Sequence, residues 1–346
     1  MRLSHEKKMK HSQRLSWLVH HILIEPLAFL NKNPIMLKTG SFHLVYFGLF
    51  AALGAMASLS IFYFYLHTRG FFSGLPVLPV ALAFVMGDMI GVKALYYISL
   101  GGKFFRDPKR YLNETTMYNQ GGLMGMTMIG IAVALAGNIN LLVMFDAMVI
   151  AGSFALFLGR LGCYNYGCCF GKPTCSHVHV KYRLDSSKIM RTNPELRNIP
   201  LVPTQLYSAY FDLFMFIVFI SITLLYPADG LIALTFVVLF NGFRILIQRY
   251  RFTEPSDLLN FTGMAILYFV LGLILWLFLF TINGGKLTAQ PLQNPFTFAA
   301  WEQFVLAAPG VMLSMVITGI VTFVFYGLHG RQLGTHINLA KKEYAD

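Results

Sequence analysis

Charged residues are scarce in this chain of 346 residues. They make up 12% of the sequence, whereas hydrophobic residues make up 56% and aromatic residues 15%. Soluble globular domains carry about 25% charged residues, so this composition excludes an ordinary soluble protein. We therefore expect an integral membrane protein, and we expect no nucleic-acid partner.

The amino terminus lacks the features of a cleavable signal peptide. Its stretch "MRLSHEKKMKHSQRLSWLVHHILIEPLAFL" interrupts short apolar patches with basic residues and has no small-residue cleavage site. Residues 1–32 are predicted to be a basic extension that lies on the membrane surface through an amphipathic face, with a disordered arm as the alternative. No internal repeat or low-complexity linker stands out either. We therefore expect one membrane domain with short appendages.

Apolar runs of about 20 residues, the length that crosses a bilayer as a helix, recur along the chain. Two pairs of runs are joined by very short turns, near Gly137 to Asn140 and near Pro227 to Gly230, which predicts two antiparallel hairpins. The predicted fold class is all-α, a polytopic helical membrane protein with about seven core spans and an eighth C-terminal span. The runs cover residues 44–66, 77–99, 121–137, 141–159, 206–226, 230–248, 259–281 and 307–328.

Lysine and arginine are nearly missing from one side of these predicted spans. Only Arg69 and Lys286 fall there, and Lys93 lies within the second span. The positive-inside rule then places both termini and the cysteine-containing loop in the cytoplasm. Anionic lipid headgroups would attract the same basic loops on either side, and both interpretations can hold together.

Some polar residues stand inside apolar runs, where each costs about 2.5–3.5 kcal/mol on insertion scales. For Asp88, Lys93 and Asp146 we expect structural pairing. Asp88 and Lys93 are five residues apart, which is a poor spacing for one helix face, so partners on other helices are expected.

The segment "NGFRILIQRYRFTEP" sets Arg244, Gln248 and Arg251 on one helix face. Two guanidiniums along one stripe form a cradle for a phosphate, because each donates two hydrogen bonds to its oxygens. The alternative is that Arg249 and Arg251 only reach toward the membrane surface. Arg160 precedes a glycine-rich turn where backbone N–H groups and a guanidinium would converge on an anion.

Cysteine is also scarce, and its four copies all lie in "CYNYGCCFGKPTC". The spacing C-x4-C-C-x5-C is not a usual zinc pattern, so we expect no metal. A disulfide from Cys163 or Cys168 to Cys175 requires an oxidising compartment. Small apolar packing at a helix end is the favoured interpretation. The other is a reactive thiol at Cys168, activated by a pKa that Arg160 lowers.

Five motifs follow one another between about Asn33 and Asn283. They are "NPIMLKTGSFHLVYFGL" with Tyr46 and Gly48, "FFRDPKRYL" followed by "NQGGLMG", "GRLGCYNYG" with Asp146 upstream, "VPTQLY", and "RILIQRYRFTEP". In this order they resemble the motifs of the bacterial prolipoprotein diacylglyceryl transferases. The resemblance implies a membrane domain at 33–283 after the extension at 1–32, with an extra span and tail at 284–346.

That resemblance implies a thiol alkylation in the bacterial cytoplasmic (inner) membrane, without a cofactor. A cysteine of a lipoprotein precursor attacks the glycerol carbon of phosphatidylglycerol or a similar anionic phospholipid, and glycerol phosphate leaves. Arg160 and Arg244 would stabilise the leaving phosphate, and Gln120 occupies the third catalytic position. The implied substrate-binding residues are Tyr46, Gly121, Gly122, Gln205, Tyr207 and Arg251. The glycines would let the backbone approach the headgroup closely.

The chain departs from the family at acid–base and polar positions. Gln120 stands where the family has histidine, and glutamine cannot act as a general base. Other replaced positions are Cys163 for asparagine, Cys168 for glutamate, Val202 for histidine and Gln248 for glutamate. Two functions therefore stay open: the transferase, and a non-catalytic or differently specific phospholipid-binding membrane protein on the same fold.

The sidedness implied by the family conflicts with the charge pattern. The family's active face looks away from the cytoplasm, whereas the motif-bearing loops of this chain are its basic ones. Either these loops serve lipid binding and the positive-inside rule misleads, or the chain is an inverted or repurposed relative with a cytoplasmic thiol substrate.

Overall fold

The computed structural model describes residues 17–39, 42–112, 119–252, 255–282 and 291–330. Its long helices are α2 (Tyr46–Thr68), α3 (Val77–Leu100), α6 (Asn119–Ala136), α7 (Leu141–Tyr166), α9 (Thr204–Leu225), α10 (Leu231–Gln248), α11 (Pro255–Ile282) and α13 (Pro309–Gly327). The short helices are η1 (His20–Ile24), η2 (Glu25–Leu30), α4 (Gly102–Arg106), α5 (Pro108–Leu112), α8 (Lys188–Thr192), η3 (Pro194–Leu196) and α12 (Phe298–Ala307).

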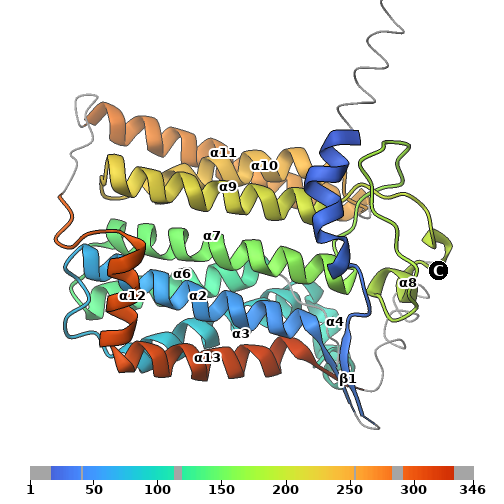
Figure 1. The fold of residues 1–346 in the computed structure, drawn as a ribbon, viewed down its shortest axis with the longest axis horizontal. Coiled ribbons are helices and arrows are strands. Elements are labelled where there is room, and N and C mark those ends of the chain that lie inside the picture. Colours follow the sequence, from blue (N-terminus) through green and yellow to red (C-terminus); the bar gives the residue numbers. More distant parts are fainter. Residues whose placement is uncertain (1–16, 40–41, 113–118, 253–254, 283–290, 331–346) are drawn as a thin grey trace, which may run out of the picture.

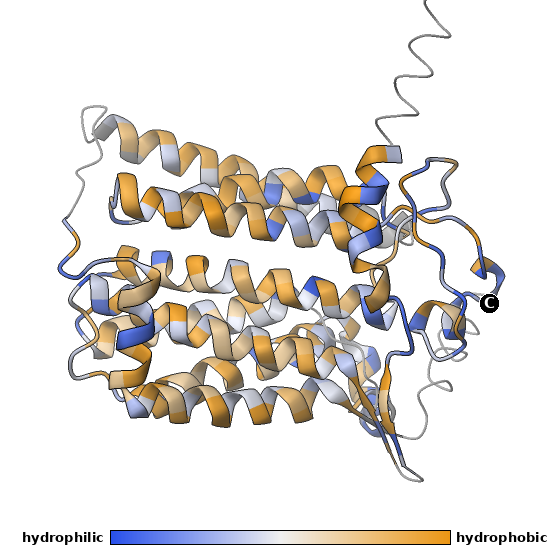
Figure 2. Ribbon diagram, in the orientation of Figure 1, coloured by the Kyte–Doolittle hydropathy of each residue, from blue (hydrophilic) through white to orange (hydrophobic). Residues whose placement is uncertain are grey.

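A helix stands at each of the eight predicted spans. Among the described residues, six helices are long and apolar enough to cross a membrane, and α6 and α11 contain shorter apolar stretches at Gln120–Ala136 and Ala265–Phe278. Figure 2 shows mostly hydrophobic residues along the helices and hydrophilic ones in the segments at both ends of the bundle. The prediction of an all-α, multi-pass membrane fold is confirmed.

The long helices run roughly side by side (Figure 1). Helix α2 packs against α7 and α13, α3 packs against α6 and α13, α9 lies on α7, and α10 pairs with α11. Lipid tails are as apolar as the helix surfaces, so close packing and polar contacts between helices hold such a bundle together. Large side chains such as Tyr63, Met144 and Phe219 are fully enclosed in its core.

Both predicted hairpins are present, and their turns meet. Asn140 caps α7, because its side chain accepts a hydrogen bond of 2.9 Å from the backbone N–H two residues on. The turn before α10 ends at Gly230, whose φ of +80° suits glycine. Asp229 joins the two turns, since it accepts from the Asn140 side chain at 2.8 Å and pairs with Arg69.

The buried aspartates serve helix contacts, as predicted. Asp146 in α7 accepts from the backbone N–H groups of Gly230 and Ala233 at 2.7 and 2.8 Å, and so binds the amino-terminal end of α10. Asp88 in α3 accepts from the Tyr326 hydroxyl in α13 at 2.6 Å. Both partners lie on other helices, which confirms structural pairing for these two residues; for Lys93 it stays a prediction.

Two pairs of glycines bring α3 and α6 into close contact. A Cβ on Gly121 would stand 2.0 Å from the Gly91 carbonyl oxygen, and one on Gly125 would stand 2.0 Å from that of Gly87. Each helix thus carries glycines four residues apart, an arrangement that lets membrane helices touch through their backbones.

Helix α13, the eighth predicted span, is packed into the bundle. A Cβ on Gly48 in α2 would stand 2.4 Å from the Cα of Gly327, so the two backbones touch. Strands β1 (Ile35–Lys38), β2 (Phe42–Val45) and β3 (Leu328–Gly330) form an antiparallel sheet in the order β1-β2-β3, which ties the end of α13 to the start of α2. The domain division at residues 32 and 283 stays a prediction.

The basic loops gather at one end of the bundle. Strand β1, α4 and α8 all lie at this end (Figure 1). The helical segment Trp17–Leu30 lies there too and exposes Trp17, Ile22 and Phe29 by 55–60%. This exposure fits the interfacial role expected of the extension, whose residues 1–16 lie outside the described part. Which compartment this end faces stays a prediction.

Candidate functional site

A small cavity of about 20 Å³ lies between α7, α9 and α10. It is lined by Arg160, Ser208, Asp212, Phe240, Phe243, Arg244, Ile247 and Arg251. The volume suits a water-sized group and is far below that of a phospholipid headgroup. The cavity therefore marks the point where the charged side chains converge, and the surrounding side chains must move apart to admit a lipid.

Three arginines reach this cavity from different parts of the chain. Arg160 comes from the last turns of α7, Arg244 from α10, and Arg251 from the segment just beyond α10. Asp212 is the only acidic residue among the lining residues. The formal charges leave a surplus of positive charge in an enclosed space, which favours an anion.

Arg160 and Asp212 form a loose ion pair. The Nε of Arg160 lies 3.9 Å from the Oδ2 of Asp212, with side chains 11% and 3% exposed. This distance is too long for a hydrogen bond, and both atoms are buried without a hydrogen-bond partner among the described residues. A buried polar group in this condition is costly unless a ligand or water satisfies it.

The stripe predicted on one helix face is present only in part, because α10 ends at Gln248 and Arg251 lies just beyond the helix. Arg244 and Arg251 both line the cavity, Gln248 between them is 3% exposed, and Arg249 is exposed. The structure thus brings Arg160, Arg244 and Arg251 together, while their role in binding phosphate stays a prediction.

Two polar residues of the cavity, Ser208 and Asp212, were missed from the sequence. With Gln205 they stand at i, i+3 and i+7 in an otherwise apolar span, which places all three on one face of α9. That polar stripe was the available signal. Phe243 closes the cavity nearby and stacks on Phe211, with ring centroids 4.0 Å apart.

The start of α9 fastens the cysteine-rich turn. The Gln205 Nε2 donates to the Cys168 carbonyl at 2.8 Å and to the Tyr182 hydroxyl at 3.2 Å. The Thr204 hydroxyl donates to the Cys169 carbonyl at 2.8 Å. The Oε1 of Gln205 is buried and has no hydrogen-bond partner among the described residues. Gln205 is thus fixed through one end of its amide and keeps an acceptor available at the other.

The turn folds three thiols together. Cys163 lies in the last turn of α7, which ends at Gly167 with φ +76°, and Cys169 adopts φ +55°. The Sγ atoms of Cys163, Cys168 and Cys169 all lie within 4.8 Å of one another. All four cysteines, including the exposed Cys175, are free thiols.

The expectation that Arg160 lowers the pKa of Cys168 was wrong. Hydrogen bonds with the thiols of Cys163 and Cys169, together with burial, raise the pKa of Cys168 well above its ordinary value. Hydrogen bonds with the thiols of Cys163 and Cys168 lower the pKa of Cys169 well below its ordinary value, and the charges of Arg251 and Arg160 add to that effect. Burial acts in the opposite direction but is the smaller influence, so the thiolate is favoured at Cys169. A reactive role for Cys168 itself stays a prediction.

Other predicted site residues lie away from the cavity lining. Tyr46 is the exposed first residue of α2, Gln120 is half-buried at the start of α6, and Tyr207 is half-buried in α9. Gly121 and Gly122 face α3, because a Cβ on Gly122 would stand 2.2 Å from the Asp88 carboxylate. Packing of α6 on α3 accounts for both glycines. The catalytic position of Gln120 and the contact of the other four residues with a headgroup stay predictions.

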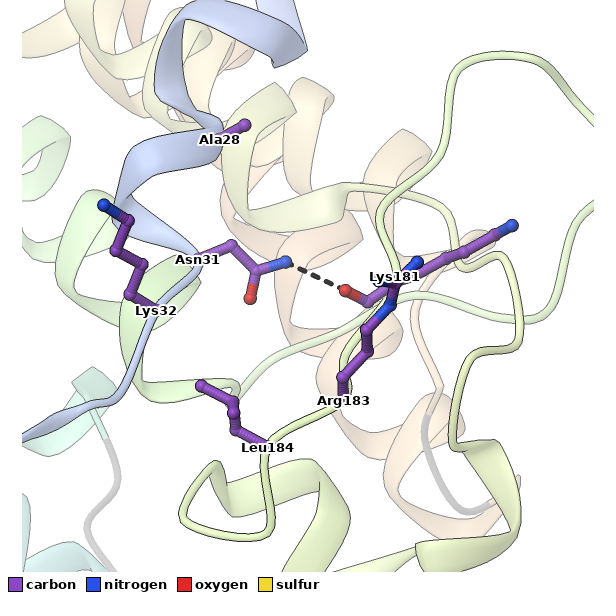
Figure 3. A pocket seen from close by; sticks show the side chains of 6 residues that line it. All are labelled: Ala28, Asn31, Lys32, Lys181, Arg183 and Leu184. Atoms are coloured by element: carbon purple, nitrogen blue, oxygen red, sulfur yellow. Dashed lines mark hydrogen bonds between the residues drawn. The ribbon is translucent and has the colours of Figure 1, made fainter.

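A second, larger hollow of about 370 Å³ opens among the loops (Figure 3). Its lining residues are Ala28, Asn31, Lys32, Lys181, Arg183 and Leu184. The Asn31 side chain donates to the Lys181 carbonyl at 2.9 Å and joins the amino-terminal segment to the loop that follows α7. Three cationic side chains line this hollow and contribute to a basic surface at this end of the bundle.

Comparison with known proteins agrees with these motifs. The family profile described as prolipoprotein diacylglyceryl transferase matches residues 34–282. The phosphatidylglycerol–prolipoprotein diacylglyceryl transferase of Clostridium tetani is 24% identical over 256 residues, covering 72% of this chain and 98% of the relative. That of Dehalococcoides mccartyi is 26% identical over 233 residues, covering 66% and 86%. The Geobacter sulfurreducens protein of the same name is 24% identical over 242 residues, covering 66% and 85%. The chain belongs to the prolipoprotein diacylglyceryl transferase family.

Proposed function

We propose that this chain is a membrane-embedded enzyme that transfers a diacylglyceryl group from phosphatidylglycerol to a cysteine thiol of a lipoprotein precursor. The relatives are named for this activity. The observation that carries the proposal is the convergence of Arg160, Arg244 and Arg251 on one buried cavity. An anionic headgroup is the ligand that such a cavity in a membrane protein favours.

The arginines suit the charge that develops in this reaction. The acceptor sulfur bonds to the glyceryl carbon while the bond from that carbon to the phosphate oxygen breaks. Glycerol phosphate leaves with the bonding electron pair and gains negative charge. Guanidiniums already in place stabilise that charge more strongly than the charge of the intact phosphodiester.

Gln205 supplies an acceptor for the headgroup. Its Nε2 is engaged by the Cys168 carbonyl and the Tyr182 hydroxyl, so its orientation is set and its buried Oε1 remains to accept a hydrogen bond. Ser208, on the same face one turn later, lines the arginine cavity. The hydroxyls of the glycerol headgroup are donors and would satisfy this oxygen.

The proposal extends to location and partners. The donor is phosphatidylglycerol or a similar anionic phospholipid, the acceptors are lipoprotein precursors, and the site of action is the bacterial cytoplasmic (inner) membrane. A multi-pass bundle with basic residues at one end supports an enzyme that works on anionic lipids.

Complementation of a bacterial strain depleted of its own transferase tests the proposal. We expect wild-type protein and Arg249→Ala to restore lipoprotein modification, and Arg160→Ala and Arg244→Ala to fail. Arg249 is the matched control because it ends the same helix but is exposed. The rate at which the purified proteins release glycerol phosphate from phosphatidylglycerol should rank the variants in the same order. Full activity in both cavity variants would overturn the proposal.

One observation favours the second function. Gln120 cannot accept the proton of an acceptor thiol, so a phospholipid-binding protein without turnover is the competing account. Binding to phosphatidylglycerol vesicles that depends on Arg160 and Arg244, with no glycerol phosphate released between pH 6 and 9 and no complementation, would establish it.

A further inference from the structure

Three of the four cysteines form a compact cluster next to the arginine cavity. The Sγ atoms of Cys163, Cys168 and Cys169 lie within 4.8 Å of one another. The charges of Arg160 and Arg251 are close enough to act on Cys169. Within the described residues, this is the only group of three or more His, Cys, Asp or Glu side chains close enough together to share a metal ion.

Rigid elements hold the cluster in place. Cys163 belongs to α7, and the start of α9 binds the carbonyl groups of both Cys168 and Cys169. Cys169 adopts a φ of +55°, a strained conformation for a residue other than glycine that persists only where the surroundings enforce it. The three sulfurs are thus gathered before any ligand arrives, as a binding site requires.

The sulfur geometry suits a thiophilic metal ion. With zinc–sulfur bonds of about 2.3 Å, tetrahedral coordination places sulfurs about 3.8 Å apart. A contraction of at most about 1 Å would bring the sulfurs of this cluster to that separation. Catalytic zinc sites have three protein ligands and keep the fourth position open. Cys168 and Cys169 are both partly accessible, so an external ligand can reach the cluster.

The net charge of a metal ion bound by three thiolates favours such a site, although three arginines lie nearby. A bare dication would be repelled by Arg160, Arg244 and Arg251. Three thiolates around a dication instead form a unit with a net charge of about −1, which the guanidiniums attract.

We propose that Cys163, Cys168 and Cys169 bind one zinc ion or a similar thiophilic dication, and that its open position binds the acceptor thiol as a thiolate. This inference rests on the proposed transferase function and deepens it. Coordination deprotonates a thiol without a general base, which is the step that Gln120 cannot perform.

The step balances. The acceptor thiol loses its proton to water on binding the metal. Its sulfur then forms the bond to the glyceryl carbon, and glycerol phosphate leaves with the electron pair of the broken carbon–oxygen bond. The thioether product carries no charge on sulfur and is a weaker ligand than a thiolate, so it leaves the metal.

Metal binding is tested on the full chain in detergent, stripped of metal and titrated with zinc or cobalt(II). Metal analysis should give about one zinc per chain, and cobalt should give a sulfur-to-metal charge-transfer absorption. Cys169→Ser should weaken zinc binding about 100-fold or more, since losing a residue that merely orients a ligand already costs about 10–100-fold. Cys175→Ser is the matched control and should bind normally. Absence of the absorption in the wild type, or its survival in Cys169→Ser, would overturn the site.

Acceptor binding is tested on the cobalt-loaded protein with a peptide of lipoprotein-precursor type. The cysteine peptide should intensify the charge-transfer absorption, and the same peptide with serine should not. An equal change of the absorption with the two peptides would show that the acceptor thiol does not bind the metal. Neither readout needs turnover: a loaded protein that binds the thiol but never transfers lipid contradicts only the proposed function, whereas a transfer rate at pH 7 that neither chelation nor Cys169→Ser lowers contradicts only the metal site.

Discussion

The Oδ2 of Asp212 lies 3.9 Å from the Nε of Arg160, and neither atom has a hydrogen-bond partner among the described residues. A phosphate that enters the cavity must therefore compete with Asp212 for Arg160. The carboxylate weakens binding of the intact lipid, but it also holds the guanidinium in the cavity. We infer that Asp212 lowers the affinity of the site for the lipid substrate but keeps the Arg160 guanidinium oriented.

Asp212→Asn should separate these two effects. The neutral amide removes the competing charge, so KM for phosphatidylglycerol should stay the same or fall. It also holds Arg160 less firmly, so kcat should fall about tenfold. Steady-state release of glycerol phosphate from mixed micelles measures both constants. A tenfold rise in KM at unchanged kcat would instead mean that Asp212 contacts the lipid itself.

Gln205→Leu should lose headgroup discrimination. The variant removes the buried Oε1, and a site built around a hydrogen bond rejects ligands that lack the donor. We expect the preference for phosphatidylglycerol over phosphatidic acid in vesicle binding to fall about tenfold, within the range for one hydrogen bond. Thr204→Val is the control: it loosens the neighbouring turn by removing the bond to Cys169 but leaves Oε1, so it should keep the preference.

Gly121→Ala tests whether this glycine serves packing or the headgroup. The new Cβ would stand 2.0 Å from the Gly91 carbonyl oxygen, so α3 and α6 must separate. We expect a loss of about 1–3 kcal/mol in the free energy of unfolding, seen as a lower melting temperature in detergent. Gly152→Ala in α7 meets nothing within 4 Å and should be neutral. A Gly121→Ala protein of normal stability with raised KM would favour the headgroup role.

Tyr326→Phe tests whether α13 stabilises the bundle. It deletes the hydrogen bond to Asp88, and such bonds between membrane helices contribute about 0.6 kcal/mol on average and up to about 1.7. We expect destabilisation of this size or somewhat more, because Asp88 is left unpaired. Tyr268→Phe, at an exposed position of α11, should change nothing. Equal stability of the two variants would show that the α3–α13 contact contributes little.

The helices were predictable because their signals are local. Apolar length locates a span, and a period of 3.6 residues places Arg244 and Gln248 on one face of α10. The partners of those residues are not local. The proximity of Arg160 and Arg244 depends on how α7 and α10 pack against each other. The sequence connects these two residues only through the family resemblance.

Other parts of the site could not be predicted for identifiable reasons. The clustering of the Cys163, Cys168 and Cys169 sulfurs could not be predicted, because Cys169 adopts a left-handed φ that no sequence feature announces. Asp212 was overlooked although its stripe with Gln205 and Ser208 was visible in the sequence. The packing partner of Gly121 is Gly91, thirty residues earlier in the chain, and no local pattern connects the two; contact of Gly121 with a headgroup stays a prediction.

The pH dependence of transfer shows how the acceptor thiol loses its proton. A free cysteine has a pKa of about 8.5, so below that pH the reactive thiolate is the minor form and its fraction rises with pH. In chelated protein the rate should therefore climb about tenfold per pH unit from pH 6 to about 8, without an inflection near 6.5, because Gln120 does not titrate.

Zinc-loaded protein should behave differently. A metal-bound thiol is already deprotonated, so its rate should vary little between pH 7 and 9. Gln120→His offers an imidazole near the operating pH and should raise the rate at pH 7 in chelated protein, where a base is missing, but not in zinc-loaded protein. Cys175→Ser should follow the wild type in both states. If zinc-loaded and chelated wild-type protein climb with the same slope, the thiol is not activated by a metal, and the base must be sought among other residues of the site.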